Sequence, residues 1–402
     1  MLPIPAPSPA SLPAHTSGNA PPLACDIFCA VVDNFGDIGV CWRLALQLAR
    51  EHGWQVRLFV DDLATFARLA PGLDPAAAKQ RIDGIAIEHW GEPVLAGDTL
   101  AIADVVIEAF ACELPAEYVH AMARRERAPV WINLEYLSAE DWVADFHRRP
   151  SPHPRYPLHK AFFFPGLGPG TGGVLKEAGL DARREAFLAS AEARDAWWRR
   201  ATGSPAPAPG TLVVSLFAYE NPALGALLEH WRDGAQPVVL LVPEGRICPA
   251  VAAFFGLPGF GAGSRAQAGQ LSAHGLAFVA QPDYDALLWA SDLNFVRGED
   301  SFVRAQWARK PFVWHIYPQA DDAHLPKLDA ALAHLTATLP APAAEAVARF
   351  WHAWNGAGTP DWADFIAHRA ALDARANAWA DELAAVGDLA GNLADFTKTQ
   401  LK

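Results

Sequence analysis

Continuous apolar runs recur at short intervals through the first half of the chain, and they predict buried β-strands. The runs are rich in Val, Ile, Leu and Phe and lack the alternation of a half-exposed strand. Amphipathic segments between several of the runs predict helices. The predicted strands are 26–33, 55–62, 85–90, 104–110, 129–136 and 160–166, and the predicted helices are 39–51, 61–70 and 115–126. Repeated strand–helix–strand connections of this kind predict a parallel, doubly wound α/β sheet.

A second series of the same kind follows the Pro-rich break TGSPAPAPG at 202–210. Its predicted strands are 211–219, 237–243, 275–281, 292–298 and 311–318, with helices at 221–232, 284–290 and 301–309. Ala-rich segments at 322–338, 341–355 and 360–398 predict helices up to the end of the chain. The second half therefore predicts another doubly wound sheet, followed by a helical region.

The length of 402 residues is too great for one ordinary core and predicts two domains. Residues 1–22, rich in Pro and Ala, are predicted to be a disordered tail. The first domain is expected at 23–201, the linker at 202–210 and the second domain at 211–376. Residues 377–402 are predicted to form a helix that packs back on the first domain. Two such sheets form a cleft between their carboxyl edges, where doubly wound folds bind ligands.

The composition is that of a globular protein, with 51% hydrophobic and 19% charged residues. A formal net charge of −13 argues against nucleic acid as the main ligand, because a duplex-binding protein needs a cationic surface. The five cysteines contain no CxxC pair, which argues against a disulfide framework or a zinc site. No signal peptide and no apolar stretch of membrane-spanning length are found. We expect a cytoplasmic protein with neither nucleic acid nor a membrane as partner.

The segment DNFGDIG at 33–39 follows the first predicted strand, where this type of fold places its chemistry. Gly36 and Gly39 allow a ligand to approach the backbone at the start of a helix. Asp33 and Asp37 are candidates for a general base and an orienting carboxylate. The alternative is structural: Asp37 would be an N-cap or first-turn residue, and Asp33 a turn former.

A second candidate segment, Arg297 to Ser301, connects a predicted strand to a predicted helix. Ser301 or Asp300 could cap that helix. The N–H groups at the helix start, with Arg297 beside them, would suit a diphosphate, and Glu299 could accept hydrogen bonds from a sugar hydroxyl. A capped helix with a surface salt bridge is the alternative. Other strand-end residues predicted to face the same cleft are Tyr219, which could stack on a base, and Gln281, Pro282 and Asp283.

Some common catalytic motifs are absent or weak. GLGPGTGGV at 166–174 has GxGxxG spacing, but Pro169 interrupts it and no acidic strand end follows. We interpret it as a flexible loop at the cleft. Neither GxSxG nor GxxxxGK[ST] occurs, which removes support from serine hydrolase and P-loop functions. The histidines show no metal-binding spacing.

Seven motifs stand along the chain, in this order: VVDNFGDIGVCWRLA, NLEYLSAEDWV, PSPHP, KAFFFPG, TGGVLKE, FAYE and VRGEDSFVRAQWARKPFVWHIYPQ. Together they resemble the EarP family of protein-arginine rhamnosyltransferases, and the resemblance extends from about Cys25 to the C-terminal helices. It implies a GT-B fold, with an acceptor domain followed by a nucleotide-sugar domain. It also implies inverting transfer of L-rhamnose from dTDP-β-L-rhamnose to an arginine of translation elongation factor P, with no cofactor and no metal.

The resemblance also implies roles for single residues. Asp37 would be the catalytic aspartate, Asp33 its supporting carboxylate and Glu299 a further catalytic residue. The residues implied in donor binding are Asn34, Phe35, Gly36, Tyr219, Gln281, Pro282, Asp283, Arg297, Gly298, Glu299, Asp300 and Ser301. Alternatives are a GT-B nucleotide-sugar epimerase, which would need no protein acceptor, and a non-catalytic nucleotide-sugar-binding regulator. A nicotinamide dehydrogenase is a more distant alternative.

Overall fold

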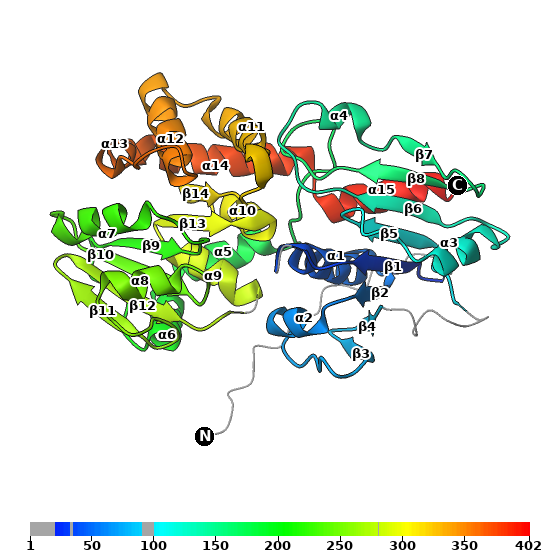
Figure 1. Cartoon of the computed structure of the whole chain (residues 1–402), viewed down its shortest axis with the longest axis horizontal. Helices are drawn as coiled ribbons and strands as arrows, with labels where there is room; N and C mark the ends of the chain where they lie inside the picture. The colour runs from blue at the N-terminus through cyan, green and yellow to red at the C-terminus, as the bar shows by residue number, and fades with distance from the viewer. Residues whose placement is uncertain (1–20, 33–34, 91–99, 280) are drawn as a thin grey trace.

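The computed structural model describes residues 21–32, 35–90, 100–279 and 281–402, and Figure 1 shows two α/β domains side by side. The first domain contains a sheet of order β3-β4-β2-β1-β5-β6-β8-β7. Its central strands pair in parallel, as predicted, whereas β3 and β7 pair antiparallel at the two edges. The strands are β1 (Ala24–Cys29), β2 (Gln55–Val60), β3 (Lys79–Ile82), β4 (Ile85–His89), β5 (Val105–Ala109), β6 (Val130–Leu134), β7 (Pro150–Pro152) and β8 (His159–Phe163).

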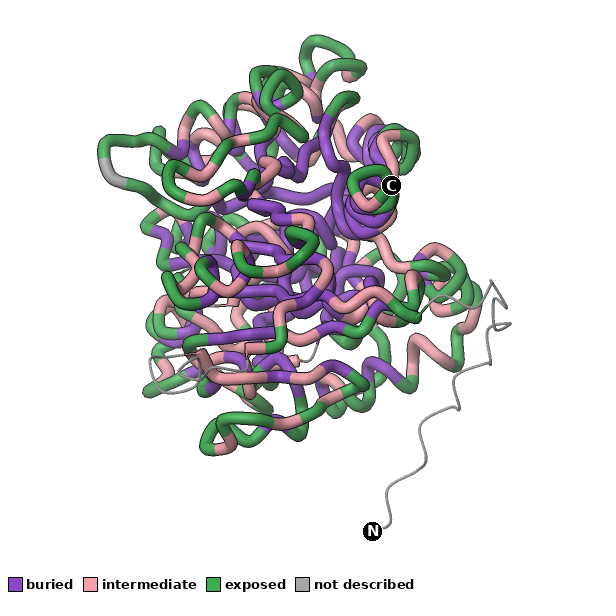
Figure 2. The backbone as a smooth tube through the Cα atoms, turned by 90° about the vertical axis from the view of Figure 1, so that its right-hand side faces the viewer, coloured by how far each residue is buried: buried purple, intermediate pink, exposed green. Residues whose placement is uncertain are grey.

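Helix α1 (Gly36–His52) packs against β1 and β2 and forms much of the first core. It ends at Gly53, whose φ of 69° is readily adopted only by glycine and whose N–H bonds to the carbonyl of Leu48. The shorter helices of this domain are α2 (Leu63–Leu69), α3 (Ala116–Ala123) and α4 (Val143–Phe146). Figure 2 shows buried strands at the centre of the molecule, enclosed by more exposed segments.

The second domain contains a sheet of order β11-β12-β10-β9-β13-β14, with β11 antiparallel at one edge. Its strands are β9 (Leu212–Leu216), β10 (Val238–Pro243), β11 (Arg265–Ala268), β12 (Leu271–Leu276), β13 (Leu293–Arg297) and β14 (Phe312–His315). The helices that follow these strands are α7 (Leu224–Asp233), α8 (Cys248–Phe254), α9 (Gln281–Ala290) and α10 (Gly298–Trp307). The predicted strand 275–281 is wrong in position, because the strand ends at Leu276 and Gln281 already begins a helix. Pro282 suits that place, since proline is favoured in the first turn.

The C-terminal region is helical, as predicted, but the segment 360–398 forms three helices. The elements are η1 (Ala320–Asp322), α11 (Leu325–Thr336), α12 (Ala341–Trp354), α13 (Trp362–Ala367), α14 (Arg369–Val386) and α15 (Leu389–Gln400). The Asp388 carboxylate caps α15 by accepting from the N–H of Gly391 at 2.7 Å. Helix α15 packs against α1, and Leu389, Leu393 and Phe396 join the first domain's core. In Figure 1, α14 runs from the second domain toward the first.

The chain first crosses between the domains earlier than predicted. Helices α5 (Leu180–Ala189) and α6 (Ala191–Thr202) pack on α9 and β12, and Trp197 and Trp198 lie in the second core. The predicted boundary at 202–210 is therefore wrong, because these buried tryptophans bind the preceding helices to the second sheet. The chain crosses back just before α15, and Val174 and Asp388 pair there in a parallel β-bridge. None of the described helices is long and apolar enough to cross a membrane.

Candidate active site

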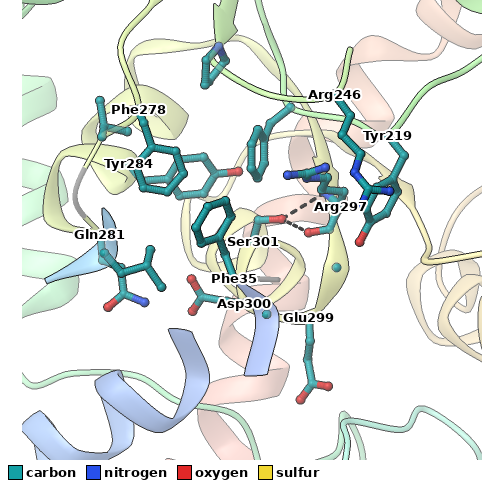
Figure 3. A pocket seen from close by; sticks show the side chains of 16 residues that line it. Phe35, Tyr219, Arg246, Phe278, Gln281, Tyr284, Arg297, Glu299, Asp300 and Ser301 are labelled. Atoms are coloured by element: carbon teal, nitrogen blue, oxygen red, sulfur yellow. Dashed lines mark hydrogen bonds between the residues drawn. The ribbon is translucent and has the colours of Figure 1, made fainter. Parts of the chain in front are cut away.

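A pocket lies between the two domains, at the carboxyl ends of β9, β10 and β13 and beside the start of α1. The first domain contributes Phe35, Gly36 and Leu69. The second domain contributes Phe217, Tyr219, Pro243, Arg246, Phe278, Val279, Gln281, Tyr284, Arg297, Gly298, Glu299, Asp300 and Ser301. Figure 3 shows these side chains converging on one space. The site thus lies where parallel sheets bind their ligands.

Cationic groups gather on one side of this pocket. Arg297 ends β13, and its guanidinium carbon lies 4.4 Å from the ring centroid of Phe217 and 4.7 Å from that of Tyr219. Stacking on aromatic faces fixes the plane of a guanidinium and offsets part of its burial. Arg246 follows β10 and lies beside Tyr219 in Figure 3. Two cations on this wall favour an anionic group in the pocket.

Helix α10 begins at the same wall. Gly298 has a φ of 62°, which allows the chain to turn directly from β13 into the helix. The Ser301 hydroxyl accepts from the N–H of Arg297 at 3.0 Å and donates to the carbonyl of Arg297. The prediction that Ser301 or Asp300 caps the helix is wrong, because both lie inside its first turn and Arg297 is the N-cap residue. The free backbone N–H groups of that turn lie at the positive end of the helix dipole, which favours a bound anion.

Glu299 points away from these cations, toward the first domain (Figure 3). Its Oε1 accepts from the N–H of Leu137 at 3.0 Å, in the segment that follows β6. Next to that contact, Tyr136 stacks on Phe110 with ring centroids 4.4 Å apart, and Tyr136 stays 37% exposed. Phe110 and Tyr136 follow the adjacent strands β5 and β6. Glu299 therefore connects the second domain's side of the pocket to an aromatic surface of the first domain.

Asp37 lies in the first turn of α1 and is only 2% exposed. Its Oδ2 accepts from the N–H of Val32 at 2.7 Å, a bond that ties the helix start to the segment after β1. The N-cap position belongs to Phe35, so Asp37 is a first-turn residue. Asp33 and Asn34 lie outside the described residues.

Aromatic side chains form the opposite wall. Phe35 and Phe278 lie 4.7 Å apart between centroids, and the Arg68 guanidinium carbon lies 4.7 Å from the ring of Phe278. Tyr284 packs edge-on against Phe217 at 5.8 Å, and burial raises the pKa of its hydroxyl well above the usual range. Its hydroxyl therefore stays protonated at neutral pH. This wall offers flat apolar faces to a planar ring.

With this geometry in place, residues 25–398 match the family of elongation factor P (EF-P) rhamnosyltransferases named EarP. The chain belongs to the EarP family. A protein-arginine rhamnosyltransferase of Pseudomonas aeruginosa is 49% identical over 92% of this chain and 98% of its own length. Another, from Neisseria meningitidis, is 37% identical over 78% of each chain. The expectation that this chain is a glycosyltransferase of the EarP family is confirmed.

A solved structure supports the same conclusion. It concerns the structural basis for EarP-mediated arginine glycosylation of translation elongation factor EF-P. It matches with a TM-score of 0.65 at 36% identity and covers 94% of this chain and 99% of its own. The two Rossmann-like domains and the pocket between them confirm the expected GT-B architecture.

The predicted site residues that the structure describes divide into three groups. Phe35, Gly36, Tyr219, Gln281 and the segment 297–301 line the pocket. Pro282 and Asp283 are exposed and do not line it, and Asp283 pairs with Arg200 at 3.3 Å. The reason is that both residues lie in the first turn of α9 instead of at a strand end. Asp37 directly follows Gly36 but is buried and is not among the residues that line the pocket.

Sequence reasoning missed seven pocket residues, namely Leu69, Phe217, Pro243, Arg246, Phe278, Val279 and Tyr284. The strand-end rule could have found Phe217, one residue after β9, and Arg246, three residues after β10. It could not have found Phe278, because the preceding strand was placed too late in the chain.

The glycine-rich loop at 166–174 has a packing role. Gly173 has a φ of 70°, and a Cβ there would lie 2.1 Å from the carbonyl oxygen of Gly387. A Cβ at Gly172 would lie 2.6 Å from the ring of Phe163. None of the residues 166–174 is among those that line the pocket. The prediction of a flexible loop at the cleft is therefore wrong. The loop packs its backbone closely against the segment at Gly387.

Proposed function

We propose that this member of the EarP family transfers L-rhamnose from dTDP-β-L-rhamnose to one arginine side chain of EF-P, with inversion at the anomeric carbon. The observation that carries the proposal is the pocket itself. It joins a cationic wall with Arg297, an aromatic wall with Phe278, and the start of α1 with its buried Asp37. EF-P is a translation factor, so we place the reaction in the cytoplasm.

The cationic wall suits the diphosphate of the donor. Arg297 can offer two parallel N–H groups to phosphate oxygens, which Lys cannot do. Arg246 and the first turn of α10 add a second positive charge and backbone donors. As the bond between the sugar and the diphosphate breaks, negative charge grows on the leaving oxygen. These preorganised groups stabilise that charge.

The aromatic wall suits the thymine ring. Phe278 and Phe35 offer flat faces, and Tyr284 keeps its proton for a neutral hydrogen bond. A pyrimidine against Phe278 would lie beside Phe35, which directly precedes α1. The anomeric carbon would then be held between the two domains.

The acceptor is chemically demanding, because a guanidinium has a pKa above about 12 and keeps its proton in ordinary sites. In the proposed step, Asp37 and Asp33 hold the guanidinium by charge-assisted hydrogen bonds and direct one nitrogen at the anomeric carbon. The C–N bond forms as the C–O bond to the diphosphate breaks. The proton of the attacking nitrogen passes to Asp37, and the displacement from the opposite face inverts the configuration.

In this proposal Glu299 would lie between the donor and the acceptor arginine. Its bond to the N–H of Leu137 orients the carboxylate toward the first domain. From there it can accept hydrogen bonds from a rhamnose hydroxyl or from the acceptor guanidinium. We propose that the reaction needs no divalent ion, since Arg297 and Arg246 supply the charge that neutralises the diphosphate. Activity that disappears in a chelator and returns with magnesium would contradict this part.

The deciding experiment mixes the purified protein with EF-P and dTDP-β-L-rhamnose and measures the intact mass of EF-P. The expected result is a gain of one deoxyhexose residue on one arginine, present with the wild-type protein and absent with Asp37→Asn. dTDP-glucose serves as the control donor. Donor turnover without EF-P would favour an epimerase. Donor binding with neither turnover nor a mass gain would favour a non-catalytic regulator.

A further inference from the structure

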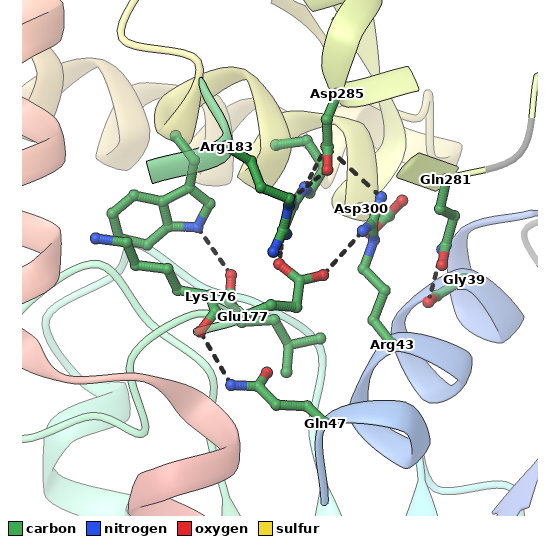
Figure 4. Close-up of polar contacts among 12 residues, drawn as sticks. Gly39, Arg43, Gln47, Lys176, Glu177, Arg183, Gln281, Asp285 and Asp300 are labelled. Carbon is green, nitrogen blue, oxygen red and sulfur yellow. Dashed lines mark hydrogen bonds and ion pairs between the residues drawn. The ribbon is translucent and has the colours of Figure 1, made fainter. Parts of the chain in front are cut away.

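One face of α1 contacts residues outside the first domain. Gly39, Arg43 and Gln47 are spaced four residues apart and therefore lie on the same side of the helix (Figure 4). The Gly39 carbonyl accepts from Nε2 of Gln281 at 3.0 Å, and Nε2 of Gln47 donates to the Lys176 carbonyl at 2.9 Å. A Cβ on Gly39 would lie 3.3 Å from Gln281 Nε2, so the glycine permits this approach.

Arg43 stands at the centre of this face, and its side chain is only 5% exposed. Its Nε donates to Oδ1 of Asp300 at 2.8 Å, and its Nη1 donates to Oε1 of Glu177 at 3.0 Å. The other oxygen of Glu177 accepts from Nη1 of Arg304 at 2.6 Å. Arg304 in turn makes a two-bond contact with Asp285, both bonds at 2.7 Å. We call these five residues the interdomain ion cluster.

The cluster joins three parts of the chain. Arg43 comes from the first domain, Asp285 and Arg304 come from α9 and α10 of the second, and Glu177 lies where the chain crosses between them. Removing two guanidinium groups from water is costly unless each donor meets a carboxylate in good geometry. Separation of the domains would break the bond from Arg43 to Asp300 and leave these charges poorly matched. The cluster therefore favours one relative placement of α1 and α10.

That placement matters for the reaction. Asp37 precedes Arg43 on α1 by six residues, about 9 Å along the helix axis. Asp300, the partner of Arg43, lines the donor pocket. The guanidinium of Arg43 thus links the helix that carries the proposed base directly to the pocket proposed for the donor.

We infer that Arg43 is a positioning residue, which sets the place of Asp37 relative to the donor through its bonds to Asp300 and Glu177. The inference rests on the proposed function, in which Asp37 receives the proton of the acceptor. A misplacement on the order of 1 Å at a reacting group costs up to about 100-fold in rate. Donor binding depends mainly on residues of the second domain and should change far less.

The test replaces Arg43 with Lys, which keeps the charge but cannot form the two directed bonds. We expect kcat for EF-P modification to fall at least about tenfold. The Kd for thymidine diphosphate should stay within about threefold of wild type, since no group on the cationic wall changes. Arg50→Lys is the matched control on the same helix, because Arg50 is 57% exposed and pairs with an equally exposed Asp83. It should leave both values unchanged.

A second variant tests the inference independently, in case Arg43→Lys does not fold. Glu177→Gln preserves the shape of the side chain and removes its charge, and we expect the same selective loss of kcat to a smaller extent. Thermal unfolding of each variant shows whether it is folded at the assay temperature. The inference is overturned if both variants keep kcat within about twofold, or if kcat and nucleotide affinity fall together. Wild-type protein that fails to modify EF-P would overturn the proposed function instead.

Discussion

The guanidinium of Arg297 lies over the ring of Tyr219, 4.7 Å from its centroid. Tyr219 lies in the loop after β9, and Arg297 ends the neighbouring strand β13, so the contact joins the carboxyl ends of two adjacent strands. The ring fixes the plane of the guanidinium, so that one edge can donate two parallel N–H groups to a pair of anionic oxygens. A diphosphate offers such a pair of oxygens on each phosphate.

Arg297→Lys should weaken the binding of thymidine diphosphate by about tenfold or more, because Lys neither stacks on Tyr219 nor forms paired bonds to phosphate. Isothermal titration calorimetry measures the change. Arg200→Lys is a suitable control, since Arg200 is 65% exposed and pairs with Asp283 outside the pocket. An unchanged affinity in Arg297→Lys would show that positive charge alone, and not the stacked guanidinium, binds the nucleotide.

Asp37→Asn should reduce kcat by about 100-fold or more, because an amide cannot receive the proton of the acceptor nitrogen. The amide oxygen can still accept from the N–H of Val32, so the midpoint of thermal unfolding should change little. Intact-mass kinetics and differential scanning calorimetry give the two quantities. A variant that unfolds, or one that keeps most of its activity, would identify Asp37 as a structural first-turn residue.

Gly173→Ala should lower the free energy of unfolding by more than about 3 kcal/mol, since the added Cβ meets backbone and the conformation is left-handed. The obstructing atom is the Gly387 carbonyl oxygen, which lies 2.1 Å from the place that the added Cβ would take. Gly210→Ala is the matched control: its φ is 88°, but no atom lies within 4 Å of the added Cβ. That variant should lose only about 1 kcal/mol, the conformational cost alone. Urea unfolding compares them, and similar losses would disprove the steric argument.

His315 should make stability depend on pH. Burial, with the nearby charge of Arg297, lowers its pKa to about 4. The unfolded state, with a histidine pKa near 6.5, binds more protons in the interval between the two values. The stabilisation is therefore complete above about pH 6.5 and decreases as the pH falls toward 4, by roughly 3 kcal/mol at most. His315→Phe should flatten this part of the curve, as measured by urea unfolding at several pH values. An unchanged slope would contradict the assignment.

Most strands of the two cores could be predicted because they are continuous apolar runs, as in β9 and β10, whereas β12 (LSAHGL) contains polar residues and was placed too late. The edge strands β3, β7 and β11 could not, because their sequences KQRI, PSP and RAQA contain no such run. The domain boundary was misplaced because the Pro-rich segment is conspicuous in the sequence, whereas the burial of Trp197 and Trp198 depends on tertiary packing.

The site shows the same division. The rule that chemistry follows strand ends found Tyr219 and Arg297, since it depends only on local order along the chain. The bond between Arg43 and Asp300 joins residues 257 positions apart, and nothing in either local pattern indicates it. Contacts between domains arise from the packing of whole elements, so one sequence read locally does not reveal them.

The bridge between Val174 and Asp388 has a mechanical consequence. A single connecting segment would leave the two domains free to rotate relative to each other about any axis. Here the segment that leaves the first domain and the segment that returns to it lie side by side, paired at Val174 and Asp388. Two chain crossings held together at one place restrict the relative rotation of the two domains more than a single crossing would.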